Sequence, residues 1–244
     1  MGEHRIPRVP LARAFDSPDE KRRYNRRLFG IIAPRYDLIT RVLSYGQDRR
    51  WKQRLVTLAA VRPGQRVLDL ACGTGDLALA LAGGGARVLG VDLTESMLRH
   101  AFAKPGADRA WWACGDMGRL PVGTSSVDIV TAGYGLRNVP SLDEGLTEIA
   151  RVLRPGGRFL SLDFNRPDGI LLREAYLAYL TVAGSVLGLA LHGDADTYRY
   201  IAASLRRYPG AGAVSARMRN AGFTPVEWHP LLGGLMSLHV AQKR

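Results

Sequence analysis

Apolar and polar positions along the chain follow two different periods. Uninterrupted apolar runs are typical of buried strands, whereas apolar residues that recur every three or four positions are typical of amphipathic helices. The runs that favour strands are residues 66–70, 87–91, 110–113, 127–132, 158–164, 223–229 and 236–240. The stretches that favour helices are residues 19–33, 47–60, 76–82, 94–103, 142–153 and 213–221.

Strands and helices therefore alternate through the middle of the chain. This alternation predicts an α/β fold in which helices cover a doubly wound, mostly parallel sheet of seven strands. The last two strands, residues 223–229 and 236–240, are expected to close the sheet as an antiparallel pair. Ligands of such sheets bind at the carboxyl ends of the strands.

The chain is predicted to form one domain with two helical additions. Residues 1–18 contain three prolines and no apolar period, so we expect a flexible basic arm. The single domain then covers residues 19–244, with a helical extension or lid at 19–62 and an apolar helical insertion at 168–208. We expect this insertion on the substrate side; core packing, or a homodimer interface with a second copy of the chain, is the alternative.

The formal net charge is +12 and is concentrated near the N-terminus. Residues 1–62 hold 15 of the 34 Lys and Arg residues but only 6 of the 22 Asp and Glu residues. We expect this block to associate weakly with an anionic membrane surface, and solvated basic helix faces are the alternative. No aromatic stacking platform or RNA-binding module accompanies the charge, so no nucleic acid partner is expected.

Cysteine usage and hydropathy indicate the compartment. Cys72 and Cys114 both follow strand-like runs and predict neither a disulfide framework nor a metal site. No apolar run has the length and purity expected of a membrane span, the nearest being residues 175–191. We therefore expect a cytoplasmic protein, with peripheral contact at the inner face of the membrane.

The loop after the first strand carries the main chemical motif. Gly73 and Gly75, with Thr74 between them, join the strand at 66–70 to the helix at 76–82. Glycine allows a sharp turn and a close approach of a ligand to the backbone. The following helix directs its free N–H groups and its positive dipole end at that ligand. The motif predicts a nucleotide-type binding site.

Two acids favour S-adenosylmethionine (SAM) as the ligand over a dinucleotide. Asp69 lies within the strand end, where it would repel a pyrophosphate and attract the methionine ammonium of SAM, directly or through water. Asp92 ends the second strand and can accept hydrogen bonds from both ribose hydroxyls. The alternative is the loose NAD fingerprint that Gly73, Gly75 and Ala78 also satisfy.

Further candidate residues for cofactor binding follow neighbouring strands. Asp116 could accept a hydrogen bond from an adenine amino group, and Met97 could pack on the adenine or in the core. The candidates at these strand ends are Leu93, Met97, Asp116, Met117 and Gly133.

Four stretches make the chain resemble the ubiquinone/menaquinone C-methyltransferases, the UbiE/MenG group. They are residues 36–51, the glycine loop, residues 133–157 and residues 233–243. The resemblance implies a class I SAM-dependent methyltransferase fold, SAM as cofactor, and C-methylation of a prenylated quinol in respiratory or photosynthetic quinone biosynthesis. Residues 133–135 and 163–167 look closer to the branch that methylates demethylmenaquinol or phytyl-naphthoquinol. A benzoquinol of the ubiquinone pathway is the alternative acceptor.

The implied reaction needs an electron-rich ring carbon, and loss of a hydroxyl proton from the quinol supplies it. The resemblance suggests that Arg137 stabilises the quinolate oxygen and that Asn138 orients the ring. An ion pair between Arg137 and an acid such as Asp143 is the structural alternative. Tyr36 is expected to belong to a lid over the site, with ordinary N-terminal packing as the alternative.

Other functions and residues are weaker candidates. His192 and His239 rank low as bases, because single histidines are more often structural. Tyr198 and Tyr200 could line the ring pocket or the core. A class I methyltransferase acting on another small molecule or on RNA, and a non-enzymatic SAM-binding accessory protein, are the competing hypotheses.

Overall fold

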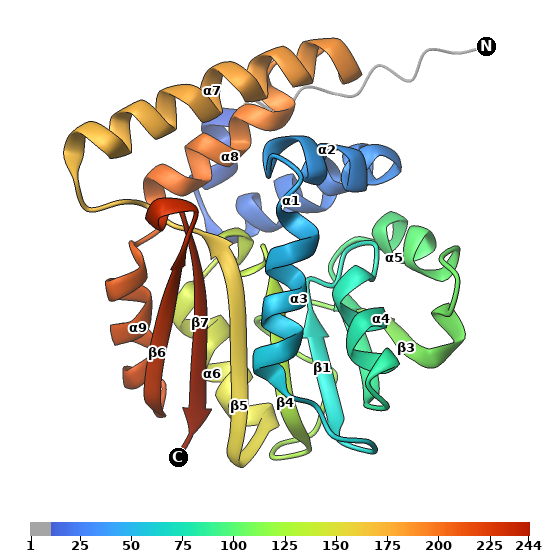
Figure 1. The fold of residues 1–244 in the computed structure, drawn as a ribbon. Coiled ribbons are helices and arrows are strands. Elements are labelled where there is room, and N and C mark those ends of the chain that lie inside the picture. Colours follow the sequence, from blue (N-terminus) through green and yellow to red (C-terminus); the bar gives the residue numbers. More distant parts are fainter. Residues whose placement is uncertain (1–10) are drawn as a thin grey trace.

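The computed structural model describes residues 11–244, and in them seven strands form one sheet with helices on both faces (Figure 1). The strand order is β3-β2-β1-β4-β5-β7-β6, and only the two pairs that involve β7 are antiparallel. The strands are Arg66–Leu70 (β1), Arg87–Asp92 (β2), Ala110–Cys114 (β3), Val127–Gly133 (β4), Leu153–Phe164 (β5), Phe223–Leu231 (β6) and Met236–Lys243 (β7). The predicted mostly parallel sheet of seven strands is confirmed.

Helices precede, join and follow these strands. In the described residues the α-helices are Pro18–Ile32 (α1), Tyr36–Leu43 (α2), Asp48–Ala59 (α3), Asp76–Gly83 (α4), Glu95–Phe102 (α5), Leu142–Val152 (α6), Ile170–His192 (α7), Asp196–Arg207 (α8) and Ala211–Asn220 (α9). Figure 1 shows α3 and α4 in front of the sheet and α6 behind it. The helix–strand alternation predicted from the apolar periods is confirmed through α3–α6.

Alternating side chains of the parallel strands fill two separate cores. Val67 packs in the core formed with α3 and α4, whereas its neighbour Leu68 packs in the core formed with α6 and α9. This period of two, with both faces apolar, is what makes the β1 sequence an uninterrupted apolar run. It also fixes β1 in the middle of the sheet, where its carboxyl end is surrounded by neighbouring strand ends.

A cap of helices lies over the carboxyl ends of the strands. Figure 1 shows α7 and α8 across the upper end of the molecule, with α1 and α2 beneath them. Tyr24 and Leu28 of α1 share a third core with Tyr198 and Tyr200 of α8, and the rings of Tyr24 and Tyr200 stack at 5.3 Å. The two helical additions, far apart in sequence, therefore form one cap.

The predicted flexible arm is wrong for the residues that the structure describes. Residues 11–15 form a short 3-10 helix, and α1 starts at Pro18, with the Ser17 hydroxyl accepting a bond from the Glu20 amide. Ala14 is fully buried and the ring of Phe15 stacks on Tyr200. Packing against α8 thus orders a segment without local periodicity. Residues 1–10 of the predicted arm lie outside the described residues.

One stretch without a predicted element is helical, and one further expectation is wrong. The stretch after Pro34 forms helix α2, because a 3-10 turn, Ala33–Arg35, places the proline in its first positions, where no N–H is needed. Ile170–His192 is long enough and apolar enough to cross a membrane by length and composition alone. The sequence expectation that no run reaches that length and purity is therefore wrong for α7.

Candidate active site

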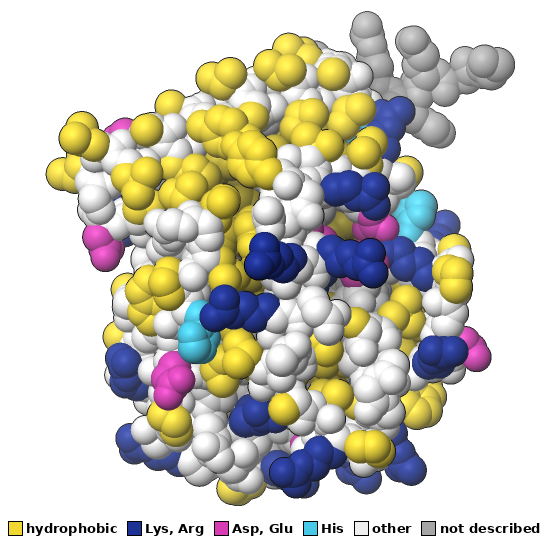
Figure 2. All heavy atoms as spheres, viewed as in Figure 1, with side chains coloured by type: hydrophobic (Ala, Val, Ile, Leu, Met, Phe, Trp, Pro, Cys, Tyr) yellow, Lys and Arg dark blue, Asp and Glu magenta, His cyan; other side chains and the backbone are white. Residues whose placement is uncertain are grey.

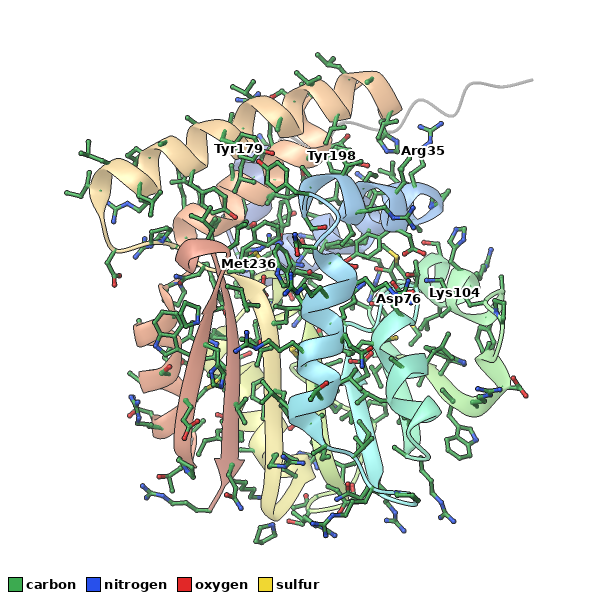
Figure 3. The ribbon with its side chains drawn as sticks, viewed as in Figure 1. Arg35, Asp76, Lys104, Tyr179, Tyr198 and Met236 are labelled. Carbon is green, nitrogen blue, oxygen red and sulfur yellow. The ribbon has the colours of Figure 1, made fainter. Side chains whose placement is uncertain are left out.

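Two adjoining cavities lie between the carboxyl ends of the strands and the helical cap. The inner cavity, about 80 Å³, is bounded by the ends of β1, β2 and β4 and by α1. The outer cavity, about 290 Å³, is bounded by α1, α2, α7, α8 and the start of β7. Figure 3 shows Tyr179, Tyr198 and Met236, which line the outer cavity, between the α7–α8 pair and the upper ends of the strands.

The glycine loop meets the inner cavity through one of its two glycines. Gly73 has φ +55° and lines the cavity, and its amide donates to Asp92 Oδ2 at 2.8 Å. Gly75, at φ +84°, lies outside the lining, and a Cβ there would come within 2.6 Å of the Trp112 ring. Gly73 therefore serves the site, whereas Gly75 allows α4 to pack closely on β3.

Asp92 is held by the backbone at the edge of the inner cavity. Its second oxygen accepts a hydrogen bond from the Thr94 amide at 2.8 Å. Burial raises the pKa of this carboxyl to about 6, although the amides of Thr94 and Gly73 oppose the shift. An oxygen bound by one amide keeps a free lone pair, so this side chain can still accept hydrogen bonds from a ligand's hydroxyls.

Asp69 lies beneath the site and does not line either cavity. It is 1% exposed, and its Oδ1 accepts a hydrogen bond from the Thr131 hydroxyl at 2.7 Å. Its Oδ2 has no hydrogen-bond partner in the described structure. Burial raises its pKa to about 7, so its charge is less stable there than in water. A direct contact with a ligand, one of the forms predicted from sequence, is not supplied by this geometry.

The remaining candidate residues for cofactor binding mostly come together. Leu93, Met97, Met117, Asp116 and Gly133 all line the inner cavity. Asp116 is also paired with Arg22 of α1 and accepts a bond from the Gly118 amide at 2.8 Å.

Thr74 does not line the inner cavity and instead links the glycine loop to the cap. Its hydroxyl donates to Asp37 Oδ1 of α2 at 2.6 Å. Lys104 contacts the same Thr74 hydroxyl at 3.0 Å and Asp37 Oδ2 at 2.7 Å, and it also pairs with Asp76 (Figure 3).

Residues of α1, which sequence reasoning missed, close the inner cavity from above. Asn25 and Phe29 line it, and the Asn25 side chain donates to the Asn138 carbonyl at 2.6 Å. Lys21 donates to the carbonyls of Arg137 and Val139 at 3.1 and 2.6 Å. Burial and the nearby Arg137 lower the pKa of Lys21 to about 8. In the sequence these residues look like one more amphipathic helix, and nothing local marks their contacts.

Four side chains line both cavities and so form the boundary between them: Phe29, Tyr36, Tyr134 and Asn138. Two of them, Tyr36 and Asn138, are among the residues predicted for catalysis. Burial raises the pKa of Tyr36 to about 12, so this phenol is neutral near pH 7. The Tyr134 hydroxyl donates to Asp48 Oδ1 at 2.7 Å, which ties the boundary to α3.

Arg137 is the one charged side chain among the described residues that line the outer cavity. Its Nε lies 3.5 Å from Asp163 Oδ1, and its backbone amide donates to Asp163 Oδ2 at 3.0 Å. Its side chain also donates to Ser204 of α8 and lies over the ring of Phe164 at 5.0 Å. Asp143, the acid suggested as its alternative partner, pairs with Arg217 instead.

The two candidate histidines do not line either cavity. His239 is buried and bonded to the Ala211 carbonyl at 3.1 Å, and burial lowers its pKa to about 4. His192 lies 2.9 Å from the Tyr198 hydroxyl. Tyr198 and Tyr200 both line the outer cavity, and burial raises the pKa of each. Within residues 11–244 no cluster of His, Cys, Asp or Glu could hold a metal ion.

These features fit an adenosyl ligand that carries an ammonium group. Asp92 offers a fixed acceptor, Gly73 brings backbone to the cavity wall, and Leu93 and Met97 supply apolar surface for a base. The unpartnered Oδ2 of Asp69 can accept from a bound water, which can in turn contact an ammonium in the cavity. No positively charged side chain lines the inner cavity in the described chain, which disfavours a pyrophosphate.

Comparison with known proteins agrees with this geometry. The model of the ubiE/COQ5 methyltransferase family matches residues 17–243. The ubiquinone/menaquinone biosynthesis C-methyltransferase UbiE of Rubrivivax gelatinosus is 39% identical over 96% of this chain and 94% of its own. The demethylmenaquinone methyltransferase of Mycolicibacterium vanbaalenii is 39% identical over 88% of this chain and 93% of its own.

The fold has solved counterparts as well. A SAM-dependent methyltransferase of Thermotoga maritima superposes with a TM-score of 0.63 at 16% identity, over 90% of this chain and 99% of its own. The expected class I fold is thereby confirmed, and SAM is the cofactor that fold and family share. The chain belongs to the ubiE/COQ5 methyltransferase family.

Proposed function

We propose that the protein transfers a methyl group from SAM to a ring carbon of a reduced, prenylated naphthoquinol, converting demethylmenaquinol to menaquinol or acting on a close relative. The observation that carries this proposal is the outer cavity. It is lined by apolar and aromatic side chains with Arg137 as its one charge among the described residues, and it meets the inner cavity at Tyr36 and Asn138. A polar ring with an apolar tail fits such a cavity, whereas an RNA phosphate does not.

Arg137 is the group that acts on the quinol ring in this proposal. SAM, when bound, supplies an electrophilic methyl group, so the protein must provide alignment and an electron-rich carbon. The guanidinium stabilises the oxyanion that forms when a ring hydroxyl loses its proton, and the apolar lining of the cavity strengthens that interaction. No Asp, Glu, His or Lys among the described residues lines this cavity, and Tyr36 is neutral, so water accepts the hydroxyl proton. The ring carbon that accepts the methyl group then loses its hydrogen as a second proton, while the ring oxygen takes a proton back from water. The aromatic quinol is thereby restored with one proton released, and S-adenosylhomocysteine is the by-product.

Asn138 and Tyr36 align the ring against the inner cavity. The Asn138 side-chain nitrogen donates to the Tyr134 carbonyl at 2.9 Å, and its Oδ1 accepts a hydrogen bond from Arg137 at 3.4 Å. These two bonds hold the Asn138 side chain at the boundary between the cavities. Tyr36 lies on the first turn of α2, with its ring 6.4 Å from that of Phe29. We assign both to positioning the acceptor carbon in line with the methyl group.

We further propose that α1 and α2 are the lid of the inner cavity. A volume of about 80 Å³ is smaller than the roughly 300 Å³ of a typical small-molecule site. The contacts of Arg22 with Asp116 and of Asp37 with Thr74 and Lys104 hold the lid down. Cofactor entry then requires α1 and α2 to move, and their return excludes water.

The names of the relatives support a quinol acceptor, and they include both the ubiquinone/menaquinone and the demethylmenaquinone enzymes. The benzoquinol of the ubiquinone pathway is therefore the second candidate. The test is a competition assay with SAM and equal amounts of a short-tailed demethylnaphthoquinol and a short-tailed demethylbenzoquinol. We expect ring-methylated naphthoquinol to dominate. Exclusive methylation of the benzoquinol would assign the other pathway, and methylation of neither would refute the quinol proposal.

A further inference from the structure

The outer side of α7 is an apolar stripe that the described chain leaves uncovered. Leu171, Val182, Val186 and Leu189 are between 58% and 88% exposed, and their spacing places them on one side of the helix. At 1.5 Å per residue the stripe is about 27 Å long. Figure 2 shows hydrophobic side chains across this upper end of the molecule.

The opposite side of α7 packs against the α8 region and the outer cavity. The exposed stripe is therefore not the side of the helix that belongs in the core. A Cβ at Gly184 or Gly188 would come within 2.8 or 2.3 Å of backbone oxygens at Tyr198 and Asp194, so these glycines bring the helix directly onto the α8 region. Tyr176 and Leu180 on that side line the outer cavity. The orientation of α7, with its stripe outward, is therefore fixed by packing.

The stripe continues to the mouth of the outer cavity. Leu172, Tyr45 and Leu232 line that cavity and are themselves 41% to 61% exposed. The Tyr45 and Tyr179 rings stack at 6.0 Å and join the end of α2 to α7. A molecule that covers the stripe thus also covers the cavity entrance.

Exposed arginines flank the same end of the molecule. Arg41 of α2 and Arg49 and Arg50 of α3 are exposed, and none pairs with an acid among the described residues. Figure 2 shows Lys and Arg side chains gathered below the hydrophobic upper end. An apolar helix face bordered by cations and aromatic rings has the chemistry of a helix that lies in the interface of an anionic bilayer.

We propose that the α7 stripe docks this protein on an anionic lipid bilayer, with the mouth of the outer cavity facing the lipid. Apolar side chains enter the acyl boundary while Arg41, Arg49 and Arg50 meet the lipid phosphates. The choice of a bilayer over a second copy of the chain rests on the proposed function, because a prenylated acceptor dissolves in lipid and must enter through that mouth. A second copy would close the mouth instead.

The experiment is co-sedimentation of the full chain with vesicles of phosphatidylcholine and phosphatidylglycerol, without acceptor or SAM. The V182D/V186D variant should bind roughly tenfold or more weakly than wild type. The control F102D/W111D introduces the same two negative charges at similarly exposed apolar side chains of α5 and β3, and it should bind like wild type. R41Q/R49Q/R50Q should also bind vesicles roughly tenfold or more weakly than wild type. R62Q/R66Q/R87Q removes three arginines at the other end of the sheet, and its loss of vesicle affinity should be less than half of the loss seen for R41Q/R49Q/R50Q.

Two other measurements separate this proposal from its rivals. Neither Val182 nor Val186 lines a cavity, so V182D/V186D should bind SAM normally, which confirms its fold. Vesicle binding that is equal for wild type and V182D/V186D would overturn the proposal, and so would no binding by wild type. A wild-type dimer that V182D/V186D converts to a monomer would assign the stripe to a second copy. A failed methyl-transfer assay would refute the proposed function without changing the vesicle result.

Discussion

The Arg137 guanidinium and the Asp163 carboxylate form a buried ion pair at the wall of the outer cavity, with Nε and Oδ1 3.5 Å apart. Their side chains are 5% and 2% exposed. Burial raises the pKa of Asp163, and Arg137 opposes this shift, so each group stabilises the charge of the other. Asp163 does not line the cavity and is therefore a positioning residue for Arg137.

Replacing Asp163 with Asn should lower kcat roughly tenfold or more while leaving the Kd of SAM unchanged. Loss of the buried partner should also lower the free energy of unfolding by roughly 3 kcal/mol. The matched control is Arg217→Ala, which breaks the exposed pair with Asp143 and should change stability by less than about 1 kcal/mol. Normal turnover by Asp163→Asn would show that Arg137 needs no such partner.

The pKa values of Asp69 and Asp92 predict how pH affects the protein. Both folded values, about 7 and about 6, lie above the unfolded value of about 3.9. The folded state binds these protons more tightly, so the stability that these groups contribute falls as pH rises from about 4 to about 7. SAM supplies hydrogen-bond donors and a positive charge to the ionised carboxylates and should offset this loss.

The rise in melting temperature caused by SAM should therefore be larger at pH 8 than at pH 5. Thermal denaturation with and without SAM across this range measures it. The Asp92→Asn variant should bind SAM more weakly, and its SAM-induced rise in melting temperature should change less with pH. An equal rise at both pH values in the wild type would contradict the role given to these carboxylates.

The two glycines of the loop should respond differently to alanine. Gly75→Ala places a Cβ against Trp112 at a left-handed backbone position, so it should cost about 2–4 kcal/mol of stability. The Cβ of Gly73→Ala would meet the Tyr36 ring at 3.6 Å and the Ala71 carbonyl oxygen at 4.0 Å, which are ordinary contacts, so this variant should cost about 1 kcal/mol but should weaken SAM binding. Urea unfolding and SAM titration of both variants test this difference, and identical profiles would refute it.

The lid contacts should control how fast the cofactor leaves. Thr74→Val removes the hydroxyl that joins Asp37 and Lys104, so SAM should dissociate roughly 3- to 10-fold faster. Thr147→Val is the matched control, because that hydroxyl bonds only within the exposed side of α6. Stopped-flow measurement gives the rate of SAM release. Equal release rates for Thr74→Val and wild type would show that the lid contacts of Thr74 do not control cofactor release.

The fold was predictable because the apolar periods are strong where both faces of the sheet are covered. β1 and β2 read as strands since Val67, Leu68, Leu70 and Val88 are all buried. The structure of residues 11–15 was not predictable, because this segment is ordered by contacts with α8, such as the stacking of Phe15 on Tyr200. Local sequence has no information on partners that distant along the chain.

The candidate site was predictable where a motif lies on one strand end. Gly73, Asp92, Met97 and Asp116 line the inner cavity as the sequence indicates. The contributions of α1 and the partner of Arg137 were missed, because they join residues 26 or more positions apart. Gly75 is the reverse case, because its spacing in the sequence is typical of a ligand-binding loop, whereas in the structure a Cβ at this position would meet the Trp112 ring rather than the cavity.

The most direct test of the whole account is single-turnover methyl transfer from saturating SAM to a short-tailed demethylnaphthoquinol, followed by mass spectrometry. Wild type should form the ring-methylated naphthoquinol, and Arg137→Ala should form it at least about 100-fold more slowly with an unchanged Kd for SAM. Arg137→Lys should recover part of the rate, because it restores the charge. Undiminished methylation by Arg137→Ala, or no methylation by a wild-type protein that binds SAM, would contradict the account.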